Sequence, residues 1–137
     1  MNLPKTDNRQ QTTDNRVRSY RDLIVYQKAK ILALGLIHFY SNKKLGWTDK
    51  YLVDQLIRAT SSIGANLAEG YGRLYKLDYR RFVSISRGSS YEVEYWIDLI
   101  VEVRPQDKSF LLKIIGPSDE ISKMLTGLMK SLGRQSV

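Results

Sequence analysis

Apolar side chains recur at helical spacing in several stretches of the chain, and polar or glycine-containing segments separate these stretches. In the first stretch, which includes Val25, Leu32 and Leu36, apolar residues follow one another at steps of three or four. Residues at this spacing lie along one side of a helix. The pattern therefore predicts a helix over residues 20–40. Further apolar residues widen this side, which is typical of a helix with more than one packing neighbour.

The same spacing predicts two further long helices, over residues 48–69 and 77–103. The first of these should end at Gly70, because a glycine often follows the last turn of a helix. Pro105 sets the end of the other, because the residue before a proline avoids the helical conformation. The buried face expected for this helix consists of Phe82, Ile85, Val93, Trp96, Leu99, Ile100 and Val103.

Gly116 and Pro117 interrupt the C-terminal part of the chain, so the sequence predicts a short helix over residues 107–115 and a last helix after the interruption. Ser118 or Asp119 would cap the amino end of that last helix. Its apolar side chains are Ile121, Met124, Leu125, Leu128 and Leu132.

Four main helices joined by short connections predict an all-α fold, an antiparallel up-and-down four-helix bundle over residues 20–134. Gly64 and Gly88 fall inside predicted helices, where each costs about 1 kcal/mol relative to Ala, so they indicate close helix contacts. Residues 1–19 are rich in Asn, Gln, Thr and Asp, which predicts a disordered, basic and polar arm. The sequence shows no signal peptide and no apolar stretch of membrane-spanning length, so we expect a cytoplasmic location and no membrane partner.

The composition excludes several classes of chemistry. The chain has 137 residues with no cysteine and one histidine, His38, so disulfides, thiolate metal sites and cysteine nucleophiles are ruled out. A single histidine also argues against an imidazole-based zinc site and against Ser-His hydrolysis. Gly70 and Gly72 follow a helix rather than a strand, so they do not fit a dinucleotide-binding loop. We therefore expect neither a metal nor a cofactor.

The charge balance favours anionic partners such as nucleic acid, because 22 Lys and Arg against 14 Asp and Glu give a net charge of +8. The up-and-down topology places the start of the chain, the connection between the second and third helices and the end of the chain at one pole. Tyr71 and Tyr75 lie in that connection and are candidates for stacking on unpaired bases. Lys130 and Arg134 add to the positive charge of this pole, although cations near helix ends also complement the helix dipole. The candidate nucleic-acid-binding residues are Arg16, Arg18, Arg21, Arg73, Lys76, Arg80 and Arg81.

Some polar residues interrupt the apolar faces of the predicted helices. Glu92 falls on the apolar side of the third helix, where an ionised carboxylate needs a cationic or hydrogen-bonded partner. Arg58 lies at a similar height on the second helix and is the candidate partner. We interpret Arg58, Asn66, Glu69 and Glu92 as a structural polar network that a neighbouring subunit covers, and a catalytic carboxylate is the alternative.

Three stretches together resemble a bacterial family of four-helix bundles, the 23S ribosomal RNA intervening-sequence proteins. These stretches read DLIVYQKA at residues 22–29, RATSSIGANLAEGYGR at 58–73 and FVSISRGSSYEVE at 82–94. The resemblance extends over residues 20–132. The sequence departs from the family pattern at Tyr26, where a tryptophan is common, and in its additional N-terminal arm.

The resemblance implies an up-and-down four-helix protomer and its assembly into a barrel-like homopentamer. It extends to the accessory proteins of diversity-generating retroelements, which are basic nucleic-acid binders that also contact a reverse transcriptase. In a parallel pentamer each basic pole would join the others in one positive rim. Such a rim would bind phosphates without reading base sequence.

The sequence therefore predicts a non-enzymatic, oligomeric helical bundle that binds RNA or DNA phosphates through its basic pole. One alternative is a protein-interaction scaffold, an accessory subunit for a nucleic-acid enzyme such as a reverse transcriptase. Another is a nuclease that uses Glu69, Glu92 and Glu94. The nuclease is disfavoured because Glu92 and Glu94 point to different sides of one helix and no paired-carboxylate metal motif is present.

Overall fold

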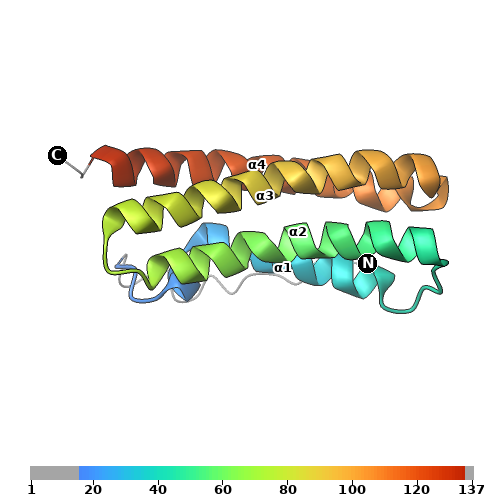
Figure 1. The fold of residues 1–137 in the computed structure, drawn as a ribbon, viewed down its shortest axis with the longest axis horizontal. Helices are drawn as coiled ribbons and strands as arrows, with labels where there is room; N and C mark the ends of the chain where they lie inside the picture. The colour runs from blue at the N-terminus through green and yellow to red at the C-terminus, as the bar shows by residue number, and fades with distance from the viewer. Residues whose placement is uncertain (1–15, 135–137) are drawn as a thin grey trace.

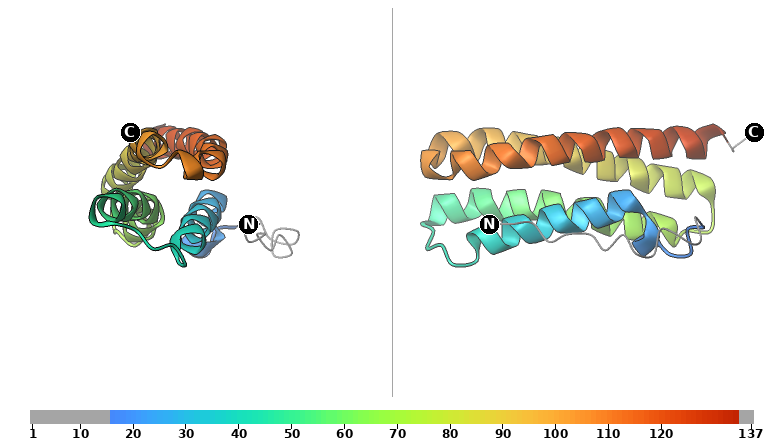
Figure 2. Two further views of the ribbon diagram at one scale, coloured as in Figure 1. Left: turned by 90° about the vertical axis from the view of Figure 1, so that its right-hand side faces the viewer. Right: turned by 180° about the vertical axis from the view of Figure 1, so that it is seen from behind.

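The computed structural model describes residues 16–134 and shows four long helices that run alternately up and down along one axis (Figure 1). Seen along this axis, the helices stand around a common core (Figure 2). Short 3-10 turns precede the first helix and join the last two. No strand occurs in residues 16–134, so the all-helical, four-helix prediction is confirmed, whereas residues 1–15 of the predicted arm lie outside the described residues. The elements are η2 (Tyr20–Asp22), α1 (Ile24–Tyr40), α2 (Trp47–Tyr71), α3 (Lys76–Val103), η3 (Pro105–Asp107) and α4 (Lys108–Arg134).

The entry into α1 is a separate capped turn rather than the first turn of the predicted helix. The Ser19 hydroxyl accepts a hydrogen bond from the Arg21 N–H at 3.2 Å. In return, the Asp22 carboxylate accepts bonds from the N–H groups of Ser19 at 3.1 Å and Arg18 at 2.9 Å. This reciprocal capping box satisfies amides that a helix end would otherwise leave free. It also fixes the direction from which the chain approaches α1.

Gly70 does not end α2, so the sequence prediction was wrong at this position. The helix continues to Tyr71, and no described residue has a positive φ. A Cβ atom at Gly70 would lie 2.6 Å from the Cβ of Phe82 on α3. The glycine is therefore needed for the close approach of α2 to α3, because any side chain would push the two helices apart.

The predicted break at Pro117 does not occur, because α4 is one continuous helix with the proline in its interior. Buried Leu111, Ile114, Ser118 and Ile121 keep helical register through this position, so both halves bury the same side. Packing of that side outweighs the backbone hydrogen bond that the proline removes. Ser118 is not a cap. Its hydroxyl is fully buried and donates to the backbone carbonyl of Ser90 on α3 at 3.2 Å.

The buried face of α3 is rotated relative to the prediction. Ile85 and Val103 were expected in the core, but they are 43% and 48% exposed. Trp96 and Leu99 are half-buried, while Phe82, Val93 and Ile100 are buried as predicted. The remaining core positions of α3 belong to Val83, Ser86, Ser90 and Ile97.

Small hydroxyl side chains let α3 pack closely against its neighbours. The Ser86 hydroxyl donates to the carbonyl of Ile63 on α2 at 2.7 Å, and the hydroxyls of Ser90 and Ser122 share a hydrogen bond of 2.7 Å between α3 and α4. These groups are buried but satisfied, so their burial carries little penalty. Serine counts as polar in a hydropathy pattern, so the pattern did not place Ser86 and Ser90 in the core. The predicted buried face of α3 was therefore rotated away from these two residues.

Candidate nucleic-acid interface

One end of the bundle collects the basic residues that the topology predicts there. The start of α1, the connection between α2 and α3, and the end of α4 lie together at this end (Figure 1). The cationic side chains at this end are exposed. We use the term basic pole for the cationic residues Arg16, Arg18, Arg21, Arg73, Lys76, Arg80, Arg81 and Lys130.

Aromatic rings join the elements of the basic pole. The rings of Tyr20 and Tyr71 lie edge to face, with centroids 6.5 Å apart, and Tyr71 packs in the same way on Tyr79 at 5.9 Å. Tyr20 also contacts Tyr26 of α1 at 5.0 Å. Burial, with a smaller contribution from Tyr71, raises the pKa of the Tyr79 hydroxyl. The cluster thus holds η2 against the α2–α3 connection.

Three arginines of the pole are oriented by contacts within the protein. Arg73 forms an ion pair with Glu69 at 2.8 Å, and its guanidinium lies 4.7 Å from the ring centroid of Phe82. The Arg81 guanidinium lies near the same ring, at 5.5 Å. Arg80 donates from Nε to the carbonyl of Met129 at 3.2 Å, which links α3 to α4. Arg80 is therefore also a structural residue, and Arg73 and Arg81 are better probes of the pole's charge.

The tip of the α2–α3 connection carries apolar side chains that the protein does not bury. Leu74, Tyr75 and Leu77 are 93%, 71% and 67% exposed. Of the two tyrosines predicted to stack on bases, Tyr71 is half-buried in the aromatic cluster, and Tyr75 alone faces solvent. The structure therefore separates a structural tyrosine from an accessible one.

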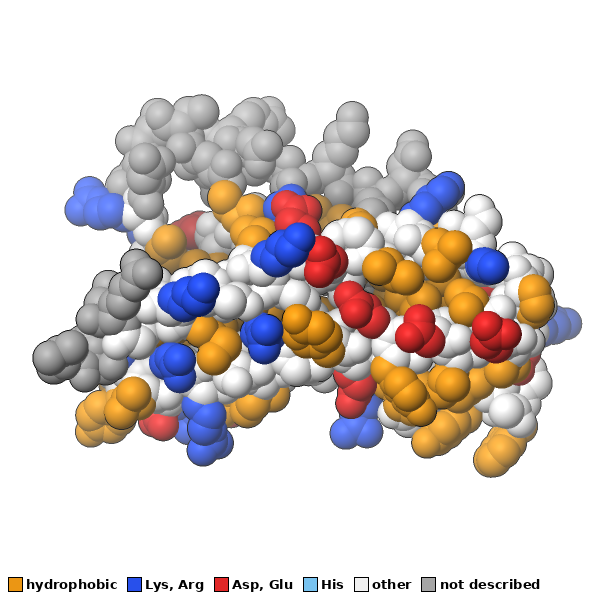
Figure 3. All heavy atoms as spheres, turned by 90° about the horizontal axis from the view of Figure 1, so that it is seen from above, with side chains coloured by type: hydrophobic (Ala, Val, Ile, Leu, Met, Phe, Trp, Pro, Cys, Tyr) orange, Lys and Arg blue, Asp and Glu red, His pale blue; other side chains and the backbone are white. Residues whose placement is uncertain are grey.

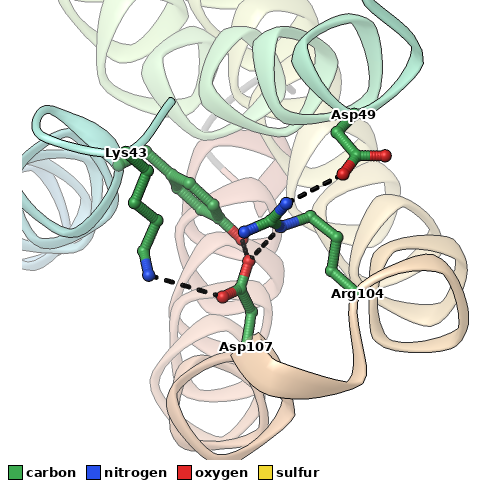
Figure 4. Close-up of polar contacts among 5 residues, drawn as sticks. Lys43, Asp49, Arg104 and Asp107 are labelled. Atoms are coloured by element: carbon green, nitrogen blue, oxygen red, sulfur yellow. Dashed lines mark hydrogen bonds and ion pairs between the residues drawn. The ribbon is translucent and has the colours of Figure 1, made fainter. Parts of the chain in front are cut away.

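The opposite end of the bundle holds a network of paired charges around Asp107 (Figure 4). The carboxylate of Asp107 is fully buried and accepts hydrogen bonds from Arg104 Nε at 2.6 Å and from the Tyr40 hydroxyl at 3.1 Å. Lys43 lies 3.5 Å from its other oxygen, and Arg104 also binds Asp49 at 2.8 Å. Burial and the charge of Asp107 raise the pKa of Tyr40, and the bonds to Asp107 and Asp49 raise that of Arg104.

The two ends therefore differ in electrostatic character. At the far end Lys43, Lys50 and Arg104 are each paired with a carboxylate, Lys50 with Asp54 at 2.7 Å. A view over α3 and α4 shows Lys and Arg gathered toward the basic pole and a row of Asp and Glu toward the far end (Figure 3). Cations that are grouped in this way produce a positive local potential, which attracts a phosphate backbone.

The predicted polar network does not form within one chain. Arg58 and Glu92 are exposed, and among the described residues neither side chain has an ion-pair partner. Glu92 thus does not lie on the buried side of α3, because that side is rotated toward the serines. Asn66 donates to the carbonyl of Ser62 at 2.8 Å, and Glu69 pairs with Arg73. Within residues 16–134, no three His, Asp or Glu side chains are grouped to hold a metal ion.

Comparisons with known proteins agree with this architecture. A family model described as 23S rRNA-intervening sequence protein matches residues 21–127. A solved structure of a protein of unknown function from the S23 ribosomal protein family of Bacteroides thetaiotaomicron has a TM-score of 0.68 and 24% sequence identity. That alignment covers 78% of this chain and 99% of the other. No curated protein matches the chain. In the described part of the chain, no helix has the length and apolar character to cross a bilayer.

Proposed function

Because this chain belongs to the 23S rRNA-intervening sequence protein family, we propose that it is a non-enzymatic, oligomeric bundle that binds nucleic-acid phosphates through its basic pole. The observation that carries the proposal is the contrast between the two ends of the molecule. At the far end Lys43, Lys50 and Arg104 are paired with carboxylates, whereas the basic pole groups eight exposed cations beside a smaller number of carboxylates. An excess of positive charge is thus exposed at the basic pole, where phosphates can approach.

Contacts between cationic side chains and phosphates hold the nucleic-acid backbone and depend little on the base sequence. Lysine and arginine side chains that meet phosphate oxygens fix the orientation of a nucleic acid but do not read its bases. We therefore propose binding to RNA or DNA with low sequence specificity. The strength of such binding depends steeply on salt, because each phosphate contact releases counterions.

We propose further that the chain assembles with copies of itself, as a homopentamer in the arrangement that the family resemblance implies. The exposed face of α3 presents Ile85, Tyr95 and Val103, and a Cβ at Gly88 on this face would contact nothing within 4 Å. A glycine inside a helix is costly, and no close contact within residues 16–134 accounts for it. A second copy that packs closely on this face explains both the glycine and the exposed apolar side chains.

A salt series of RNA and DNA binding tests the role of the basic pole. The variant combines Arg73→Ala, Arg81→Ala and Lys130→Ala. Its control combines Lys44→Ala, Lys108→Ala and Lys113→Ala, which lowers the net charge equally at the far end. We expect the pole variant to bind more weakly and its salt slope to fall by about 0.7 to 0.9 for each lost phosphate contact.

The far-end control separates a local effect from one of net charge. It should bind nearly as the wild type does, with only a small general loss. Equal losses in the two variants would reject the pole as the binding surface. A wild-type protein that binds neither RNA nor DNA at low salt would reject the proposed function itself.

The second candidate function is an accessory subunit that docks onto a nucleic-acid enzyme such as a reverse transcriptase. Trp47 and Tyr51, at the amino end of α2, are 85% and 52% exposed and favour a protein contact there. This candidate would be supported if the wild-type protein binds the enzyme but not nucleic acid, and if Trp47→Ala abolishes the binding to the enzyme. Unchanged enzyme binding in that variant would remove Trp47 from the argument.

A further inference from the structure

Three tyrosines lie at and near the α2–α3 connection, and the side chain of the middle one, Tyr75, points in a different direction from the other two. Tyr71, Tyr75 and Tyr79 are spaced by four residues, so a continuous helix would place them on one side. The helix is interrupted here, and Tyr75 has an extended backbone, with φ −109° and ψ 138°. Tyr71 and Tyr79 pack against each other at 5.9 Å, whereas Tyr75 is 71% exposed.

Cations lie close to this exposed ring in the sequence. Arg73 and Lys76 flank it in the sequence, and Arg81 follows one turn and a half further along α3. Leu74 and Leu77 extend the apolar surface on either side. An aromatic face beside several cations is the arrangement with which proteins bind unpaired nucleotides, because the base stacks while the phosphates meet the charges.

We infer that Tyr75 is a stacking residue for an unpaired base, so that the basic pole prefers single-stranded over double-stranded nucleic acid. This inference rests on the proposed function and adds the class of nucleic acid to it. In a duplex the phosphates are accessible but the faces of the bases are covered by their neighbours in the stack. A duplex would therefore use the cations alone, whereas a single strand would use the cations and the ring.

The carboxylates near the tip also favour a flexible strand. Glu69 pairs with Arg73, and Asp78 lies in the first turn of α3. A single strand can direct its phosphates toward the cations and away from these groups, whereas a broad anionic surface cannot. An anionic lipid surface is thus the less favoured partner for the same apolar and cationic tip, and the experiment includes it.

The test compares an unstructured single-stranded RNA with the duplex that it forms with its complement, at one salt concentration and with the full chain. The variants are Tyr75→Ala and Tyr75→Phe, and the matched control is Tyr51→Ala, an exposed tyrosine at the far end. We expect Tyr75→Ala to weaken single-strand binding by roughly five- to a hundredfold. Duplex binding should change by less than about twofold, and Tyr75→Phe should behave as the wild type, because the ring is kept.

Different results separate this inference from the proposed function. If the wild type binds both RNAs with a steep salt dependence but Tyr75→Ala weakens them equally or not at all, the stacking role is wrong and phosphate binding stands. If Tyr75→Ala impairs binding to vesicles of mixed phosphatidylglycerol and phosphatidylcholine and leaves RNA binding intact, the tip is a lipid contact and the inference is overturned. A circular dichroism melt of each variant verifies that the bundle is folded.

Discussion

Asp107 is a buried carboxylate that three side chains contact, one from its own turn and two from the end of α1 and the loop that follows it. Arg104 and Tyr40 donate hydrogen bonds to one of its oxygens, and Lys43 lies 3.5 Å from the other. The sequence pattern did not predict these pairs. Tyr40 and Asp107 are 67 positions apart, so only the folded topology brings them together.

We expect Asp107→Asn to destabilise the protein by about 3 kcal/mol, because it removes one of the two carboxylates that compensate partly buried Arg104 and the one that Lys43 faces. Asparagine keeps the shape of the side chain, so the change reports on charge rather than on packing. Urea unfolding of the variant and the wild type measures the difference. The control is Asp54→Asn, whose exposed pair with Lys50 should contribute only about 0.5 kcal/mol. Equal effects of the two substitutions would contradict the role of the buried network.

At the scale of the helices, α4 shows how packing overrides a local sequence signal. Pro117 removes one backbone hydrogen bond, yet Leu111 and Ile114 before it and Ile121 and Leu125 after it bury the same side. The steps between these apolar residues stay in phase across the proline. That phase was available in the sequence and is the signal that would have identified one helix instead of two.

Replacement of Pro117 by Ala is expected to stabilise the protein by up to about 3 kcal/mol, because it restores a hydrogen-bond donor in the interior of α4. Thermal unfolding of the two proteins side by side provides the measurement. Gly116→Ala serves as a control, because its Cβ would meet nothing within 4 Å and should add about 1 kcal/mol. A loss of stability in Pro117→Ala would mean that the neighbouring helices require the proline.

The number and the order of the main helices followed from the spacing of apolar residues, but the rotation of α3 did not. Hydropathy placed Ile85 in the core and Glu92 beside it, whereas the structure buries Ser86 and Ser90 instead. A serine whose hydroxyl reaches a backbone carbonyl of a neighbouring helix costs little to bury, and its small size permits close packing. Such partners lie on other helices, so a single-helix pattern cannot predict them.

At the scale of the whole molecule, the placement of the basic pole was predictable because it depends only on topology and on the positions of Lys and Arg. The burial and the contacts of the individual residues at this end were not predictable. Tyr71 and Tyr75 have the same side chain and lie four positions apart, but one is part of the aromatic cluster and the other faces solvent. Likewise, Arg80 contributes a link to Met129 that its sequence position does not indicate.

Assembly through the exposed face of α3 can be tested at Gly88. We expect Gly88→Gln to reduce the subunit mass in light scattering toward the 15.8 kDa of one chain, because a long side chain would block a close contact. Gly127→Gln is the matched control on α4, since a Cβ there also meets nothing within 4 Å. The helix content of both variants should match that of the wild type. An unchanged mass in Gly88→Gln would exclude this face as the interface.

The polarity of the bundle also bears on how the protein is handled in experiments. The first helix begins and the last helix ends at the same end of the bundle, beside the basic pole (Figure 1). A reporter attached directly before residue 16 or directly after residue 134 would therefore sit next to the surface under study, and an acidic tag at those positions would compete with RNA for it. The loop between α1 and α2 lies at the far end and is exposed at Ser41 and Asn42. A label introduced in that loop would leave the basic pole unobstructed.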